Sequence, residues 1–176
     1  MGLWMIQSVK KEIGQDLDFG EICTLASVNT VESIVDCNDI RFLAPESMTK
    51  EVQQACLETK QQIPQGIAEV AAVIYNSLAK CYRAAIKEIE EATGNIFHSI
   101  HIVGGGSSAQ YLNRLTAKET GRTVYAGPTE ATAIGNICCQ MIANNELKDL
   151  TEARNCIYES FLIQIFKSKL VEGEIK

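Results

Sequence analysis

The sequence contains no apolar run of about 20 residues, the length that a membrane-spanning helix requires. Its N-terminus has no basic segment followed by an apolar core, so no secretory signal is predicted. Lysine and arginine number 16 against 22 aspartate and glutamate residues, which gives a net charge of -6. This excess of negative charge provides no general attraction to nucleic acid or anionic membranes. We therefore expect a cytoplasmic protein that binds neither nucleic acid nor membrane.

Patterns typical of metal sites and disulfide frameworks are also missing. The 7 cysteines form no C-x-x-C pair, and His98 and His101 are the only histidines. Tetrahedral zinc needs clustered donors, so we expect no metal site. An odd number of cysteines does not complete a disulfide framework, and most of these thiols are expected to be small buried apolar residues. The two histidines are expected at the edge of the core or in solvent rather than in catalysis.

The composition that remains is typical of one globular domain, with 46% hydrophobic and 22% charged residues in a chain of 176. Apolar residues at helical spacing predict four helices in the first half, over about residues 3–13, 18–26, 47–61 and 67–93. Gly14 and Gly94 end the first and last of these, and Pro64 excludes a continuation of the third. The last helix is apolar around most of its circumference, which predicts burial between layers.

The hydrophobic spacing changes in the second half. Residues 99–103 are rich in β-branched side chains and are followed by glycine, which predicts a strand that is buried on both faces. A helix that ends at Gly121, a second strand over residues 123–126 and a helix capped by Thr129 are expected to follow. The chain is therefore predicted to have a helix-rich α/β fold with few strands. Because two strands make a poor sheet, we expect the chain to be part of a larger protein.

Three consecutive glycines, Gly104, Gly105 and Gly106, join the first predicted strand to the next helix. Glycine lets a ligand approach the backbone, and the first turn of a helix suits a phosphate because its N–H groups are unpaired. Ser107 or Ser108 can cap that helix. The loop has neither the Gly-Lys-Ser of a P-loop nor a G-x-G-x-x-G pattern. It is interpreted as a place where a nucleotide lies against backbone, and a turn chosen only for its geometry is the alternative.

The local sequence also gives expectations for residues outside the glycine loop. Gln7 can offer a ligand both a donor and an acceptor from the first helix, although a lone glutamine there is typically a surface residue. Trp4 is expected in the core rather than at a binding site, and Phe42 and Leu43 are expected to anchor their connector to the core. Gly135 lies on an apolar helical stripe, where we expect another helix to pack against it.

The segment IHIVGGGSSAQYLNRLTAKETGRTVYAGPTEATAIGN resembles the C-terminal signature of the FGGY carbohydrate kinases. MGLWMIQ and NDIRFLAPESM precede it in the order and spacing of that family, and within the family the similarity is greatest to the rhamnulokinases. The resemblance covers about residues 1–155, and the tail after Asn155 departs from it. It implies that residues 1–176 are an incomplete C-terminal domain of an actin-like, ribonuclease H-like ATPase fold, with nucleotide bound between two domains.

The same resemblance implies a site and a reaction. Gly105 and Gln7 match positions that contact ATP or ADP, and Gly104 and Gly106 are neighbours in the same loop. The implied reaction is the transfer of phosphate from ATP to L-rhamnulose, which gives ADP and L-rhamnulose 1-phosphate, with Mg²⁺ bound mainly through the nucleotide phosphates. A sugar kinase for xylulose, glycerol or fuculose is one alternative, and a non-catalytic helical interaction module is another.

The family's phosphate loop, sugar pocket and catalytic aspartate precede the segment that this chain matches, and none of them occurs in it. No catalytic residue is therefore assigned here. We expect the chain by itself to bind nucleotide weakly or not at all, and to be inactive without the N-terminal kinase domain.

Overall fold

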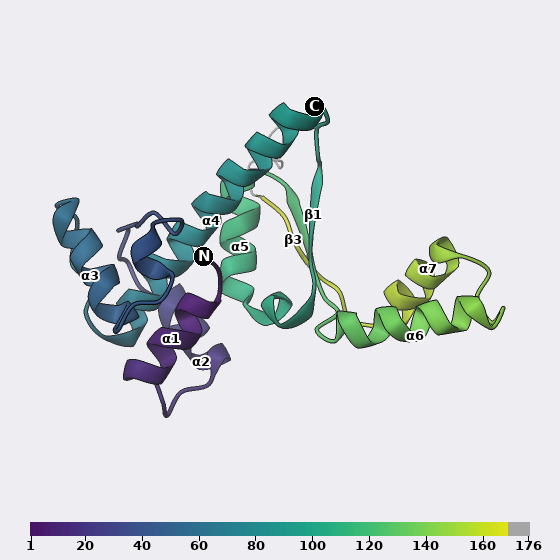
Figure 1. Cartoon of the computed structure of the whole chain (residues 1–176), viewed down its shortest axis with the longest axis horizontal. Coiled ribbons are helices and arrows are strands. Elements are labelled where there is room, and N and C mark those ends of the chain that lie inside the picture. Colours follow the sequence, from purple (N-terminus) through teal and green to yellow (C-terminus); the bar gives the residue numbers. More distant parts are fainter. Residues whose placement is uncertain (169–176) are drawn as a thin grey trace.

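The computed structural model describes residues 1–168 of the chain. Its first half consists of α1 (Trp4–Ile13), α2 (Phe19–Ser27), the 3₁₀ turn η1 (Ile40–Phe42), α3 (Met48–Glu58) and α4 (Gly66–Thr93). Its second half consists of β1 (Ser99–Ile102), the 3₁₀ turn η2 (Gly104–Ser108), α5 (Gln110–Thr120), β2 (Thr123–Ala126), α6 (Ala131–Ala143), α7 (Leu150–Ser160) and β3 (Gln164–Phe166). A helical body, a small sheet and the α6–α7 hairpin follow one another along the long axis (Figure 1). The predicted helix-rich α/β fold is confirmed.

Glycines end the helices where the sequence predicts. The Gly14 N–H donates to Lys10 O at 2.9 Å after α1, and Gly94 follows α4 in the left-handed region with φ 68°. The third helix is shorter than predicted because Lys60 takes a left-handed φ of 56°. Gln61 N then donates to Cys56 O, which closes α3 with a Schellman-type turn before Pro64 is reached.

The core surrounds the first half of α4, where every residue from Val70 to Tyr75 is buried. The predicted burial of α4 is confirmed for this half only, because the half beyond Ala79 extends past the packed helices and is largely exposed. Phe42 is fully buried, as predicted. Leu43 is exposed, so its predicted anchoring is wrong, since the short η1 turn buries only one of these neighbouring side chains.

Trp4 is also exposed, and its predicted core position is wrong. Met5, Ile6 and Val9 occupy the buried face of α1. Neighbouring residues in a helix point about 100° apart, so Trp4 faces away from the core.

The sheet has the order β1-β2-β3. β1 and β2 are parallel, with Ser99 opposite Thr123, whereas β3 is antiparallel to β2 and comes from the tail where no strand was predicted. The predicted burial of β1 on both faces is wrong, because only one of its faces, that of Ile100 and Ile102, is half-buried. On the opposite face the exposed His101 ring stacks on Tyr125, with 5.0 Å between ring centroids.

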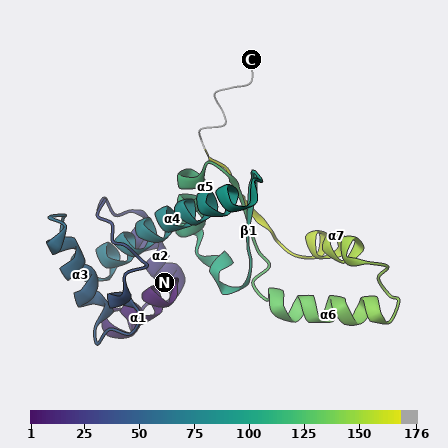
Figure 2. The same ribbon diagram turned by 45° about the horizontal axis from the view of Figure 1, so that its top comes forward.

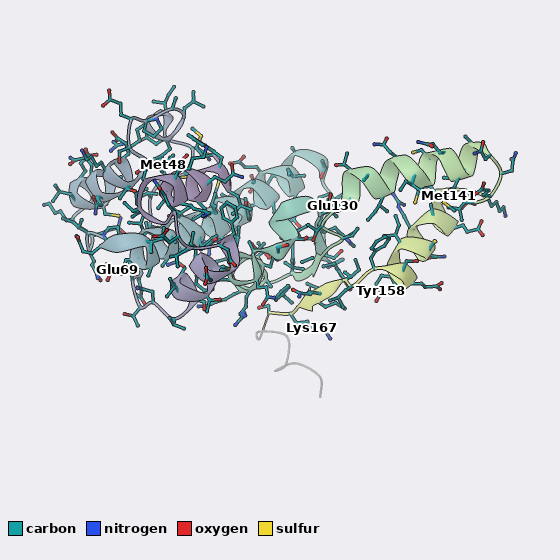
Figure 3. All side chains as sticks on the ribbon, turned by 90° about the horizontal axis from the view of Figure 1, so that it is seen from below. Met48, Glu69, Glu130, Met141, Tyr158 and Lys167 are labelled. Atoms are coloured by element: carbon teal, nitrogen blue, oxygen red, sulfur yellow. The ribbon has the colours of Figure 1, made fainter. Side chains whose placement is uncertain are left out.

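The hairpin of α6 and α7 lies away from the helical body in all views (Figures 2 and 3). Its own apolar cluster contains buried Cys138, Leu147 and Ala153. A Cβ added at Gly135 would meet no heavy atom within 4 Å, so the helix that was expected to pack there is absent from the described residues. Thr129 does not cap α6 either, because the helix begins after Glu130 without a side-chain cap.

The distal end of α4 is tied to the sheet through Glu90 and Arg122. Glu90 Oε1 accepts from Phe97 N at 2.9 Å and from the Arg122 guanidinium, and 19% of each charged side chain is exposed. Arg122 also donates to Phe97 O and Thr120 O, both at 2.7 Å. The Phe97 N–H and the Arg122 guanidinium hold the pKa of Glu90 below its ordinary value. One ion pair thus joins α4 to the starts of β1 and β2.

Glu12 joins α1 to the start of α3. Its carboxylate accepts from Met48 N at 2.7 Å, Thr49 N at 3.0 Å and the Ser47 hydroxyl at 2.9 Å. Burial alone raises the pKa of Glu12, but the hydrogen bonds from Thr49, Met48 and Ser47 outweigh it and lower the pKa overall. The ionised form is therefore the one that stabilises the fold.

Glu12→Gln is expected to make the stability of the chain less sensitive to acid. A depressed folded-state pKa contributes stability that is complete above the ordinary glutamate pKa of about 4.3 and is lost as the pH falls through the folded value. Urea unfolding of both proteins between about pH 6 and pH 3 measures this contribution. The exposed Glu46, replaced by glutamine, is the matched control. Equal slopes of stability against pH for Glu12→Gln and the unsubstituted chain would contradict the assignment.

Candidate functional site

The turn after β1 depends on Gly104. Its φ of +73° lies in the left-handed region, where an L side chain is strained. Its N–H donates to Pro128 O at 3.0 Å, and Gly127 N donates to Ile102 O at 2.9 Å, which fixes the turn to the segment after β2. Gly104 therefore sets the direction of the chain as it leaves the sheet.

The residues after Gly104 form η2 and delay the start of α5. The Ser107 hydroxyl donates to Gly104 O at 2.7 Å, and Asn113 Nδ2 donates to Ser107 O at 2.8 Å. The N-cap position of α5 is Ala109, which has no side-chain hydrogen bond. The predicted serine cap is wrong, because Ser107 closes the 3₁₀ turn and Ser108 lies within that turn.

The backbone at Gly105 is uncovered. A Cβ added there would meet no heavy atom within 4 Å, and its φ does not lie in the left-handed region. A Cβ added at Gly106 would lie 3.4 Å from Leu3 Cδ1, which is ordinary contact. Neither residue needs to be glycine for the chain to fold in this shape, so the open backbone suits a ligand.

A cavity of about 570 Å³ lies beside this turn, between α1, α2, α4 and η2. Its polar rim consists of Gln7, Gly105, Gly106 and Ser108. Its apolar walls are Leu3, Ile6, Phe19, Tyr75 and Ala109. The structure thus brings together three of the four residues that the sequence proposed for nucleotide contact, from α1 and from η2 about 100 residues later. Gly104 does not line the cavity.

Gln7 lies on the exposed side of α1, and its side-chain amide has no hydrogen-bond partner in the described part of the chain. An amide in this state can donate one hydrogen bond and accept another. It lines the same cavity as the glycine turn. The position fits a residue that orients a polar ligand.

Sequence reasoning did not identify the apolar walls. Tyr75 is buried in the middle of α4, where it forms an edge-to-face pair with Tyr111 at 5.9 Å between ring centroids. Burial, with a smaller effect of Cys23, raises the pKa of the Tyr75 hydroxyl and keeps it neutral. Phe19 is the first residue of α2 and 49% exposed. An aromatic residue directly after the helix-capping Asp18 is the one local sequence signal that could have revealed this wall.

A second hollow of about 600 Å³ adjoins the cavity and shares Gly20 and Ser108 with it. Asp18 and Glu21 line this hollow and form the capping box of α2. Asp18 Oδ1 accepts from Glu21 N at 2.8 Å, and Glu21 Oε2 accepts from Asp18 N at 2.7 Å. The N-terminus of α2 is therefore occupied by the chain's own carboxylates, which repel a phosphate.

Two kinds of feature are absent from residues 1–168, the described part of the chain. No group of three or more histidine, cysteine, aspartate and glutamate side chains is arranged to hold a metal ion. Within the same residues, every helix is too short or too polar to cross a bilayer.

Residues 2–144 match the family model for the C-terminal domain of the FGGY family of carbohydrate kinases. The chain belongs to this family. This match includes α1, the glycine turn and α6, and therefore the whole of the cavity described above. Membership agrees with the resemblance identified in the sequence.

Curated relatives of this FGGY chain carry the name rhamnulokinase. Those of Oceanobacillus iheyensis and Bacillus subtilis are 44% and 43% identical to it, each over 98% of its length. That of Klebsiella pneumoniae is 40% identical over 89% of its length. The match spans 37%, 36% and 32% of these three relatives, so the chain corresponds to about a third of each.

Proposed function

We propose that this chain is the nucleotide-binding C-terminal part of a rhamnulokinase. The intact kinase would transfer the γ-phosphoryl group of ATP to L-rhamnulose, giving ADP and L-rhamnulose 1-phosphate, in rhamnose metabolism. The observation that carries the proposal is the cavity that both Gln7 and the uncovered backbone of Gly105 line. The names of relatives that are more than 40% identical support the choice of sugar. Residues 1–176 are proposed to be an incomplete domain of the actin-like ATPase fold.

The lining of the cavity fits one end of an adenine nucleotide. Gly105 and Gly106 let a phosphate or ribose reach the main chain, and the Gln7 amide, which also lines the cavity, offers hydrogen bonds. The apolar walls suit an uncharged ring system. No carboxylate lines the cavity, so Mg²⁺ would be carried by the nucleotide phosphates.

The catalytic aspartate and the sugar pocket are proposed to belong to the rest of the kinase. Phosphoryl transfer depends mainly on positioning and on stabilising charge, and this chain would position the nucleotide. Seven free cysteines support a reducing compartment, and the cytoplasm is proposed.

The isolated chain is expected to bind ADP weakly and to show no kinase activity. Titration of the ¹⁵N-labelled chain with millimolar ADP should shift the amide signals of Gly105, Gly106 and Gln7. A coupled ADP-release assay with ATP and L-rhamnulose should remain at background, because the catalytic aspartate is proposed to belong to the rest of the kinase.

Activity is tested in a chimera. This chain replaces the matching C-terminal segment of the Bacillus subtilis rhamnulokinase, to which it is 43% identical. The chimera should phosphorylate L-rhamnulose, and the same enzyme without any C-terminal segment is the control. An inactive but folded chimera, or an isolated chain whose spectrum does not respond to ADP, would contradict the proposal. A non-enzymatic interaction module predicts both of those results.

A further inference from the structure

We propose that Phe19 is the wall of the cavity on which the adenine base packs, and that Lys10 is a positioning residue that holds Phe19 in place. The inference rests on the proposed nucleotide function and adds the orientation of the ligand to it. Its starting point is the cation of Lys10, which lies 5.8 Å from the centroid of the Phe19 ring.

Phe19 has the surface that a flat heteroaromatic base requires. It is the first residue of α2, it lines the cavity, and 49% of it is exposed. The neighbouring walls, Leu3, Ile6 and Tyr75, are apolar as well. A base packed against an aromatic ring removes apolar surface of both partners from water. No other aromatic side chain of this cavity is exposed, since Tyr75 is 2% exposed.

The charges around the cavity fix which end of the nucleotide lies where. The carboxylates of Asp18 and Glu21 lie in the adjoining hollow and disfavour phosphate on the α2 side. The backbone at Gly105 and Gly106 is open and has no carboxylate beside it in the cavity lining. The phosphates therefore lie toward the glycine turn, and the base lies toward Phe19.

The Lys10 ammonium group is hydrogen-bonded to the loop between α1 and α2. It donates to Leu17 O, to Gln15 O at 3.2 Å and to Gly14 O at 3.5 Å. Three carbonyls take all three N–H donors of the ammonium group, so none is left for a ligand phosphate. The bonds instead fix the loop that leads into Phe19, and the cation–π contact sets the place of its ring.

Separate probes for the two ends of the nucleotide test this inference. The ¹⁵N-labelled chain is titrated with adenosine, with inorganic pyrophosphate and with ADP. Adenosine should shift the amide signals of Phe19 and Gly20, and pyrophosphate should shift those of Gly105 and Gly106. Phe19→Ala should weaken the binding of adenosine and of ADP by about tenfold and leave the affinity for pyrophosphate unchanged. Phe19→Tyr should bind all three ligands as the unsubstituted chain does.

Lys10→Met should weaken the binding of adenosine but not that of pyrophosphate. The adjacent Lys11→Met is the matched control, because the Lys11 side chain is exposed and lies outside the cavity. If Lys10→Met disrupts the fold, Lys10→Arg is used, which should preserve adenosine binding. Equal adenosine affinity of Lys10→Met and Lys11→Met would overturn the role of Lys10.

Two results separate this inference from the proposed function. If Phe19→Ala binds adenosine and ADP as the unsubstituted chain does, the base does not pack on Phe19, while nucleotide binding stands. An equal loss of pyrophosphate binding in Phe19→Ala also overturns the inference, because the effect is then not specific to the base. If ADP shifts no signal in the unsubstituted chain, both proposals are wrong.

Discussion

Replacing Gly105 with leucine is expected to reduce ADP binding below detection while the chain stays folded. The added side chain meets no protein atom within 4 Å at its Cβ, so it can enter the cavity without straining the backbone. It would occupy the space proposed for the nucleotide next to the open main chain. Titration of the ¹⁵N-labelled variant with ADP measures the effect, and signals from α4 report on the fold.

Gly135→Leu is the matched control for this result. Gly135 also has open space at its Cβ, but it lies on α6, outside the cavity. This variant should bind ADP as the unsubstituted chain does. ADP binding by Gly105→Leu with unchanged affinity would remove Gly105 from the proposed site. In the full-length chimera, the same substitution should raise the KM for ATP.

Replacing Arg122 with methionine is expected to lower the melting temperature by several degrees. The substitution leaves the Glu90 carboxylate without its cation and removes the donors to Phe97 O and Thr120 O. Both charged side chains are only 19% exposed, so water replaces these bonds poorly. Thermal unfolding followed by the fluorescence of Trp4, the only tryptophan, measures the change.

Arg83→Met is the control that shows whether removing any arginine of an ion pair lowers the melting temperature. Arg83 pairs with Glu119 at 3.1 Å, but its side chain is 58% exposed. Exposed ion pairs contribute little to stability, so the melting temperature of this variant should change little. Equal shifts for the two variants would contradict the role assigned to Arg122.

The sequence was sufficient to predict features that depend on neighbouring residues. Gly14, Gly94 and Gly121 end helices where expected, since each lies at the end of a helical apolar pattern. β1 and β2 were predicted from their β-branched residues and the glycines beside them. The pairing of Gln7 with Gly105 came from the family resemblance, because no local pattern connects two helices so far apart in the chain.

The features that were missed depend on tertiary contacts. β3 is a strand because it completes hydrogen bonds with β2, and its three residues are too few to form a recognisable pattern. Ser107 bonds back to Gly104 rather than capping α5, which depends on the bend at Gly104. Phe19 and Tyr75 line the cavity because α2 and α4 lie beside the glycine turn, and no local sequence pattern indicates that arrangement.

The separation of the α6–α7 hairpin from the helical body has a thermodynamic consequence. Its cluster of Cys138, Leu147 and Ala153 shares no member with the core around α4. Cooperative unfolding requires contacts that couple one part of a chain to another. The hairpin can therefore open by itself while α4 keeps its protected amides, and a single two-state free energy does not describe the whole chain.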